Sequence, residues 1–119
     1  MGSEVTATCK CGLRSHIMIG GGMDDFMNTC WFPCLCKSCS NVEQVNLLAK
    51  PPVCPRCKSE EIIPYDRPEL CGKSGKHEVA EWNDAVQLGR NLHLTDGTYL
   101  CPRCDSMTLR FEGTGLCWD

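Results

Sequence analysis

The sequence predicts a small, mostly-β fold that is stabilised by metal-bound cysteines and has at most one short helix. Twelve cysteines among 119 residues indicate either a disulfide scaffold or metal sites. Most of them stand in closely spaced pairs, and the apolar residues between the pairs form short runs that glycine and proline interrupt. Runs of this length suit strands better than long helices. We therefore expect a single domain over residues 1–119, built of two units in which tight cysteine turns, here called knuckles, alternate with hairpins.

The chain opens without the basic, apolar and small-residue succession of a secretory signal, and no apolar run is long enough to span a membrane. These features predict a cytoplasmic protein with no membrane partner. Thiols stay reduced in the cytosol, where paired cysteines bind metal more often than they form disulfides. Metal sites are therefore expected rather than a disulfide scaffold.

Residues 4–19 predict a strand, a tight turn and a second strand. Apolar residues alternate with polar ones up to Cys9, and Gly12 allows the positive φ that such a turn needs. The second apolar run, 17–19, ends at three glycines, 20–22, which we interpret as a flexible turn.

The central unit is expected over residues 30–65. The apolar stretch 26–35 should pack beneath the first knuckle, which begins at Cys36. A strand over 42–48 stops at two prolines, and residues 62–63 form the returning strand after the second knuckle. The unit thus reads strand, knuckle, strand, turn, knuckle, strand.

The only helical candidate lies in the last third of the chain. Residues 66–77 are polar and read as a connecting loop, and the segment 78–88 then carries apolar residues at i, i+3 and i+7. This spacing predicts a helix that ends at Gly89 and directs Trp82 into the core.

A final hairpin is expected over residues 92–111. Apolar residues alternate in both of its strands, and the Asp96–Gly97 pair between them is a favourable hairpin turn. His93 falls on the polar side of the first strand, so we expect it in solvent. Residues 90–112 should combine with 4–20 to form the second unit.

The strongest metal signal lies in the central unit. Two CxxC pairs are separated by fourteen residues, a spacing typical of a structural zinc site with four cysteine ligands. Soft thiolates in a closed tetrahedron suit Zn²⁺, which needs no redox tuning. The predicted ligands are Cys36, Cys39, Cys54 and Cys57.

A second predicted site joins the two ends of the chain. The third CxxC pair, Cys101 and Cys104, has no partner pair within the usual distance, and the remaining close pair is Cys9 and Cys11. We expect these four cysteines to share a second zinc ion, which makes two zinc ions per chain.

Other potential ligands leave a competing arrangement open. Cys30 and Cys34 stand in an apolar stretch, where buried packing is the simpler interpretation. Cys71 and His77 lie in the polar loop that follows the central unit. Either of the first two could form a further site with either of the last two.

The knuckles resemble those of zinc ribbons, a family found in transcription, translation and many uncharacterised microbial proteins. The CPRC sequences at 54–57 and 101–104 are close to the family's CPxCG motif, but they lack its glycine. The residues that follow the last cysteine of each knuckle are Gly12, Ser40, Lys58 and Asp105. The resemblance implies two zinc-ribbon-like units with structural zinc. It says little about the biological role.

These features predict a protein-interaction module rather than an enzyme. The three histidines show no HxxxH or HxE pattern, so a catalytic zinc with an open position is not expected. The formal net charge is −3, and each four-thiolate zinc centre adds about −2, which gives about −7 for the loaded protein. This charge favours a protein partner over nucleic acid.

Two functional alternatives stay open. A rubredoxin-like iron protein uses the same four-cysteine geometry for electron transfer, and a thiol redox or metal-responsive protein would use the additional cysteines, Cys117 included. The cations beside the knuckles also allow two readings, either a local basic surface or side chains that donate toward sulfur. These cations are Lys10, Lys37, Arg56, Lys58 and Arg103.

Overall fold

The computed structural model describes residues 2–21, 29–73, 75–84 and 89–118. Within them the chain forms strands and one short 3-10 turn, so the expected mostly-β fold is confirmed. The strands are β1 (Gly2–Thr8), β2 (Arg14–Gly20), β3 (Trp31–Cys36), β4 (Asn41–Asn46), β5 (Ile62–Pro64), β6 (Glu78–Asp84), β7 (Arg90–Thr95) and β8 (Arg110–Trp118). The 3-10 turn is η1 (Pro68–Leu70).

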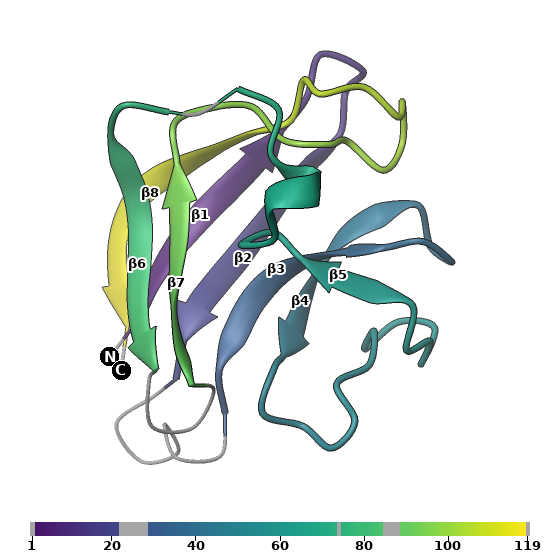
Figure 1. The fold of residues 1–119 in the computed structure, drawn as a ribbon, viewed down its shortest axis with the longest axis vertical. Coiled ribbons are helices and arrows are strands. Elements are labelled where there is room, and N and C mark those ends of the chain that lie inside the picture. The colour runs from purple at the N-terminus through teal and green to yellow at the C-terminus, as the bar shows by residue number, and fades with distance from the viewer. Residues whose placement is uncertain (1, 22–28, 74, 85–88, 119) are drawn as a thin grey trace.

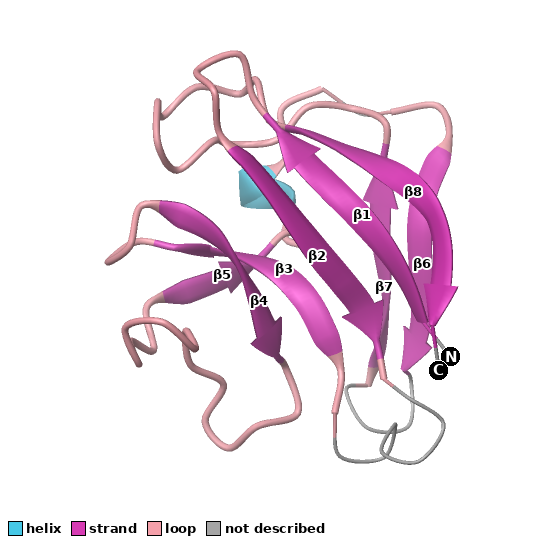
Figure 2. Ribbon diagram, turned by 180° about the vertical axis from the view of Figure 1, so that it is seen from behind, coloured by secondary structure: helices cyan, strands magenta, loops and turns pink. Residues whose placement is uncertain are grey.

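The strands form two antiparallel sheets (Figures 1 and 2). The larger sheet has the order β4-β3-β2-β1-β8, and the short strand β5 pairs with β3. The smaller sheet, β6 and β7, lies across β1, β2 and β8 (Figure 1). Because β1 pairs with both β2 and β8, the first and last strands of the chain lie side by side.

The predicted helix over 78–88 is wrong for the residues that the structure describes. Residues 78–84 form β6, which pairs with β7 so that Glu81 faces His93, and residues 85–88 lie outside the described part of the chain. A register shift between Glu78 and Ala80 interrupts the two-residue period of this strand. Such a bulge offsets the side-chain alternation, and an offset strand can imitate the spacing of a helix.

Trp82 packs against the core, as expected, but it does so from a strand. A Cβ atom added to Gly20 would lie 2.4 Å from the Trp82 ring, so only glycine lets the two sheets approach at this point. Gly20 also has a φ of 93°, which disfavours any other residue. The contact fixes β6 against the end of β2.

The Asp96–Gly97 turn does not close the hairpin expected over 92–111. The strand before it, β7, pairs back with β6, and Tyr99 beyond the turn bridges to Leu109. The Asp96 carboxylate instead accepts hydrogen bonds from the backbone N–H groups of Lys76 and His77, at 2.9 and 3.2 Å. The turn therefore carries the chain from the small sheet toward the last knuckle.

An aromatic cluster fills the core beside the end of β5. The rings of Tyr65, Tyr99 and Phe111 meet edge to face, with centroids 5.2 to 5.9 Å apart. All three side chains are buried, as are Cys30 and Cys34 in the same core. No helix in the described residues is long and apolar enough to cross a membrane.

Candidate metal centres

The second knuckle of the central unit shows how the backbone aims two sulfurs at one point. The N–H of Cys54 donates to the carbonyl of Ser59 at 2.9 Å, which begins a tight turn. Inside it, the N–H of Lys58 donates back to the carbonyl of Cys54, also at 2.9 Å. These two bonds fix the backbone on both sides of Cys57.

The C-terminal knuckle repeats this pattern. The backbone N–H of Cys101 donates to the carbonyl of Ser106, and the backbone N–H of Asp105 donates to the carbonyl of Cys101, each at 2.9 Å. The N-terminal knuckle is one residue shorter, with Cys9 donating to Leu13 at 3.1 Å and Gly12 donating to Cys9 at 3.0 Å. The knuckles at the two ends of the chain therefore share one pattern of backbone hydrogen bonds.

The residue after each knuckle has a positive φ. This conformation is easy for glycine and costs other residues roughly 1–2 kcal/mol. Lys58 and Asp105, which stand where the zinc-ribbon motif has glycine, also have a positive φ. The backbone of the knuckle is therefore kept without glycine. The φ values are 100° at Gly12, 52° at Ser40, 63° at Lys58 and 59° at Asp105.

The four cysteines predicted for the first site converge into one group, here called the central cluster. The sulfurs of Cys36 and Cys57 are 3.5 Å apart, and those of Cys39 and Cys54 are 3.7 Å apart. All four ligand atoms lie within 4.8 Å of one another. Four sulfurs around one Zn²⁺ at 2.3 Å would be separated by about 3.8 Å, whereas a disulfide bond is about 2.05 Å long. The donor set therefore fits a tetrahedral metal ion.

The structure also brings together the four cysteines assigned to the second site, here called the terminal cluster. The sulfur of Cys9 lies 3.6 Å from that of Cys104, and the sulfur of Cys11 lies 3.7 Å from that of Cys101. These four atoms also lie within 4.8 Å of one another. The pairing of β1 with β8 carries the two knuckles to the same end of the sheet, at the top of Figure 1.

The thiols of each cluster differ in acidity. Burial opposes ionisation at Cys9, but the backbone N–H of Cys11 and the hydroxyl of Thr108 outweigh it and lower the pKa of Cys9 to about 6. The backbone N–H of Ser59 lowers the pKa of Cys57 to about 7. At these two cysteines the turn therefore favours a thiolate, the form that binds metal.

Other thiols in the same clusters are held protonated. Burial raises the pKa of Cys36, and it raises the pKa of Cys101 to about 12. The neighbouring sulfur of Cys57 raises the pKa of Cys39. Four thiolates cannot crowd together without a cation between them. A divalent ion would remove this conflict, because it binds all four sulfurs in the ionised form.

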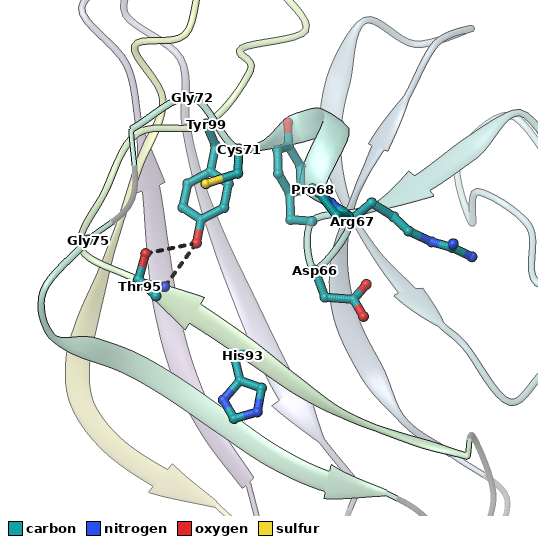
Figure 3. A pocket seen from close by; sticks show the side chains of 10 residues that line it. Asp66, Arg67, Pro68, Cys71, Gly72, Gly75, His93, Thr95 and Tyr99 are labelled. Atoms are coloured by element: carbon teal, nitrogen blue, oxygen red, sulfur yellow. Dashed lines mark hydrogen bonds between the residues drawn. The ribbon is translucent and has the colours of Figure 1, made fainter.

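The competing ligand set is not assembled. Among the described residues, Cys30, Cys34, Cys71 and His77 belong to no group of potential metal ligands. Cys30 and Cys34 are buried in the core, which matches the packing interpretation. Cys71 lines a separate cavity of about 400 Å³, in which His93 lies at the opposite end (Figure 3). The side chain of Cys117 lies outside the described part of the structure.

A third group of potential ligands escaped the sequence analysis. His93 Nδ1 is hydrogen-bonded to Glu78 and lies 3.5 Å from a carboxylate oxygen of Glu81. The three side chains are each about half exposed, and a hydrogen bond from His93 lowers the pKa of Glu78. The group was hidden because it depends on the register of β6 and β7, where a helix was expected. The three side chains form a hydrogen-bonded histidine–carboxylate group on the surface.

The cations beside the knuckles do not share one role. Arg56 pairs with Glu43 at 3.1 Å instead of donating to sulfur. Within the described residues, the side chains of the other four cations, Lys10, Lys37, Lys58 and Arg103, form no hydrogen bond or ion pair. They are left available to solvent or to a partner.

A groove of about 280 Å³ lies between the two clusters. Its apolar lining comes from Leu35 and Leu100, together with Pro102 of the last knuckle. Lys37 of the first central knuckle and Asp105 of the last knuckle supply its charges. Both clusters therefore support the rim of one groove.

Comparison of the chain with protein-family models, curated proteins and solved structures gives no match. The clusters themselves show what the site can do. Two groups of four cysteines at metal-binding distance indicate a metal-binding structural protein.

Proposed function

We propose that the chain is a zinc-stabilised protein-interaction module with two structural zinc ions and no catalytic activity. The observation that carries the proposal is the closure of both clusters, in which four sulfurs lie within 4.8 Å of one another. Four thiolates fill a tetrahedral shell and leave no position for substrate or water. The residues that would hold the ions are Cys36, Cys39, Cys54 and Cys57 in one site and Cys9, Cys11, Cys101 and Cys104 in the other.

The chemistry of the donors supports zinc. Thiolate sulfur is a soft ligand, and a closed tetrahedral set of four is typical of structural zinc. Bound zinc would fix each knuckle against its partner and thereby join segments that the small hydrophobic core alone holds together weakly. The zinc-ribbon resemblance of the knuckles agrees with this role.

A protein partner is supported by charge and by the groove between the clusters. The loaded chain would carry about −7, which opposes general binding to a phosphate backbone. Leu35 and Leu100 line the groove together with the charged side chain of Lys37. A groove of mixed apolar and polar character suits a protein side chain better than a nucleic acid.

Metal analysis tests the first half of the proposal. Elemental analysis of protein purified without added metal should give two zinc ions per chain. Cys54→Ser and Cys104→Ser should each reduce the count to one, and Cys71→Ser, outside both clusters, should leave it at two. A count of one for the unaltered chain, or iron in excess of zinc, would refute the assignment. Iron would make the purified protein red and would favour a rubredoxin-like carrier.

Site-specific crosslinking tests the second half. A photoreactive residue at Lys37 should give a discrete protein adduct in cells that express the chain. The same residue at Glu112, which is exposed on β8 and does not line the groove, should not. Equal labelling at the two positions, or a nucleic-acid adduct at Lys37, would contradict a protein partner in the groove.

A further inference from the structure

We infer that the two clusters bind metal cooperatively and that Tyr65 is the residue that couples them. The inference rests on the proposed function, because it concerns how the two proposed zinc sites communicate. Tyr65 belongs to neither cluster, and it lies on the covalent and hydrogen-bonded route between them. It acts as a positioning residue for the last knuckle.

The first part of the route runs along β5. This strand has only three residues, and it pairs with the end of β3 so that Ile62 faces Cys36. It follows the knuckle of Cys54 and Cys57, which must meet the knuckle of Cys36 to complete the central cluster. The position of β5 therefore depends on whether the two central knuckles are held together.

The second part of the route is the side chain of Tyr65, which follows β5 directly. Its backbone N–H donates to Pro33 at 3.1 Å, so the residue is anchored to β3. Its hydroxyl donates to the carbonyl of Leu100 at 2.8 Å, and the ring is 1% exposed. This hydrogen bond is partly buried, and breaking it would deprive the Leu100 carbonyl of its protein partner.

The third part of the route is Leu100, which immediately precedes Cys101. The Leu100 N–H donates to Leu70 at 2.8 Å, so both of its backbone groups are held from the segment 65–70. Burial raises the pKa of the Tyr65 hydroxyl. The hydroxyl therefore stays a donor beside the terminal cluster.

These contacts explain how metal in one cluster would raise the affinity of the other. When metal holds the central knuckles together, β5 and Tyr65 are fixed, and Tyr65 presents Cys101 in the position that the terminal cluster requires. Without that metal, the three-residue strand β5 is held less firmly. Metal binding at the terminal cluster must then also order β5 and Tyr65, and its affinity falls. By thermodynamic reciprocity, metal in the terminal cluster raises the affinity of the central one by the same factor. We expect a factor of about ten, within the usual range for such couplings.

Native mass spectrometry of the full chain during a zinc titration tests the inference, because it counts apo, singly loaded and doubly loaded protein directly. Tyr65→Phe keeps the ring in the aromatic cluster and removes only the hydroxyl donor. If the two sites have similar affinities, loss of a tenfold coupling should raise the singly loaded species at half-saturation about twofold, from about a quarter to about a half. Tyr99→Phe is the matched control. Tyr99 belongs to the same aromatic cluster, but its hydroxyl is hydrogen-bonded to Thr95 and not to the last knuckle. This variant should leave the distribution unchanged.

A second measurement gives the coupling factor itself. Zinc competition with a chromophoric chelator should show about tenfold weaker binding at the terminal cluster in Cys39→Ser/Cys57→Ser than in the unaltered chain. In the Tyr65→Phe background the same pair of substitutions should have little effect on that affinity. If the cysteine variant does not fold, the titrations of Tyr65→Phe and Tyr99→Phe decide the question alone.

The outcomes separate this inference from the proposed function. Binding of fewer than two zinc ions by the unaltered chain would refute the proposed function. Two zinc ions that load independently, or equal loading curves for Tyr65→Phe and the unaltered chain, would refute only the coupling. A change of the same size in Tyr99→Phe would show that the coupling is not specific to the Tyr65–Leu100 hydrogen bond, and it would refute the role of Tyr65.

Discussion

The central and terminal clusters share a local design and differ in how the chain brings them together. Cys36 and Cys57 are 21 positions apart in the sequence, whereas Cys9 and Cys104 are 95 positions apart. Closing the longer loop costs about 1.3 kcal/mol more in chain entropy, from (3/2)RT ln(95/21). The central cluster can therefore assemble within one short segment, but the terminal cluster needs most of the chain in place.

The surrounding strands show the consequence. At the terminal cluster, seven-residue β1 pairs with both β2 and β8, so the sheet itself carries Cys9 and Cys101 to one end. At the central cluster, the returning strand β5 has only three residues. We infer that strand pairing brings the ligands of the terminal cluster together. In the central unit the dependence is reversed, because metal bound by the central cluster would hold the short strand β5 in place.

Loss of a central ligand should have the largest effect. Structural zinc contributes roughly 10–16 kcal/mol to the folding of small zinc domains, and a typical domain has a total stability of only about 5–15 kcal/mol. Cys54→Ser should therefore unfold the central unit, seen as loss of amide-exchange protection over residues 30–65. Cys71→Ser is the control, because it removes a half-buried cysteine outside both clusters, and its melting temperature should change little. Equal thermal shifts for the two variants would contradict the assignment.

Loss of the terminal cluster should have a smaller and more local effect. Cys9→Ser/Cys11→Ser removes half of the ligands but leaves the hydrogen bonds of β1 with β2 and β8 intact. We expect one zinc ion to remain, and faster amide exchange over residues 99–109, where the last knuckle is tied to Leu70 and Leu109. An undisturbed C-terminal segment would show that Cys101 and Cys104 do not depend on the N-terminal pair. Loss of both zinc ions would show that the clusters form one unit.

The comparison also explains what could be predicted from the sequence. Metal chemistry restricts cysteine spacing, so the knuckles were recognisable even where Lys58 and Asp105 replace glycine. The grouping of Cys9 with Cys104 followed from matching the remaining pairs, because no local signal connects residues so far apart. The strand, turn and strand predicted over residues 4–19 correspond to β1 and β2, because the alternation in the first segment and the apolar run of the second are local signals.

The small sheet was missed because its strand pairing is not local. The bulge in β6 interrupts the two-residue period, and only the partner strand β7 reveals that residues 78–84 are extended. The Asp96–Gly97 pair favours a hairpin, but the Asp96 carboxylate binds the backbone of the preceding loop instead. The histidine–carboxylate group of His93 and the proposed coupling through Tyr65 both depend on such tertiary contacts, which leave no pattern in the sequence.

The residues after the knuckles allow a finer test of the shared local design. Gly12 has a φ of 100°, and a Cβ atom there would have no neighbour within 4 Å, so Gly12→Ala should cost only backbone strain, about 1–2 kcal/mol. Lys58 has a φ of 63°, so Lys58→Gly should relieve strain and, after the entropy cost of glycine, stabilise the chain by up to about 1 kcal/mol. Chemical denaturation of the zinc-loaded variants measures both changes. Effects of the same sign would show that the two knuckles do not share the conformation that the structure assigns to them.

The smallest expected effect distinguishes the two CPRC knuckles, which are identical in sequence. Arg56 pairs with the mostly buried carboxylate of Glu43 at 3.1 Å, whereas Arg103, at the same place in the other knuckle, forms no ion pair within the described residues. Among the described residues, Glu43 would retain only the amide of Asn41, at 3.3 Å, if the arginine were removed. Because Arg56 is 68% exposed, solvent screens the pair, and Arg56→Gln should cost at most about 1 kcal/mol.

Arg103→Gln makes the same chemical change without an ion pair to lose, so it should be nearly neutral. Denaturation of both variants at low and high salt measures the difference, which should shrink as salt screens the Arg56–Glu43 attraction. Two equal costs that do not depend on salt would show that each arginine acts through its knuckle backbone. The Arg56–Glu43 ion pair would then not account for any difference in stability between the two knuckles.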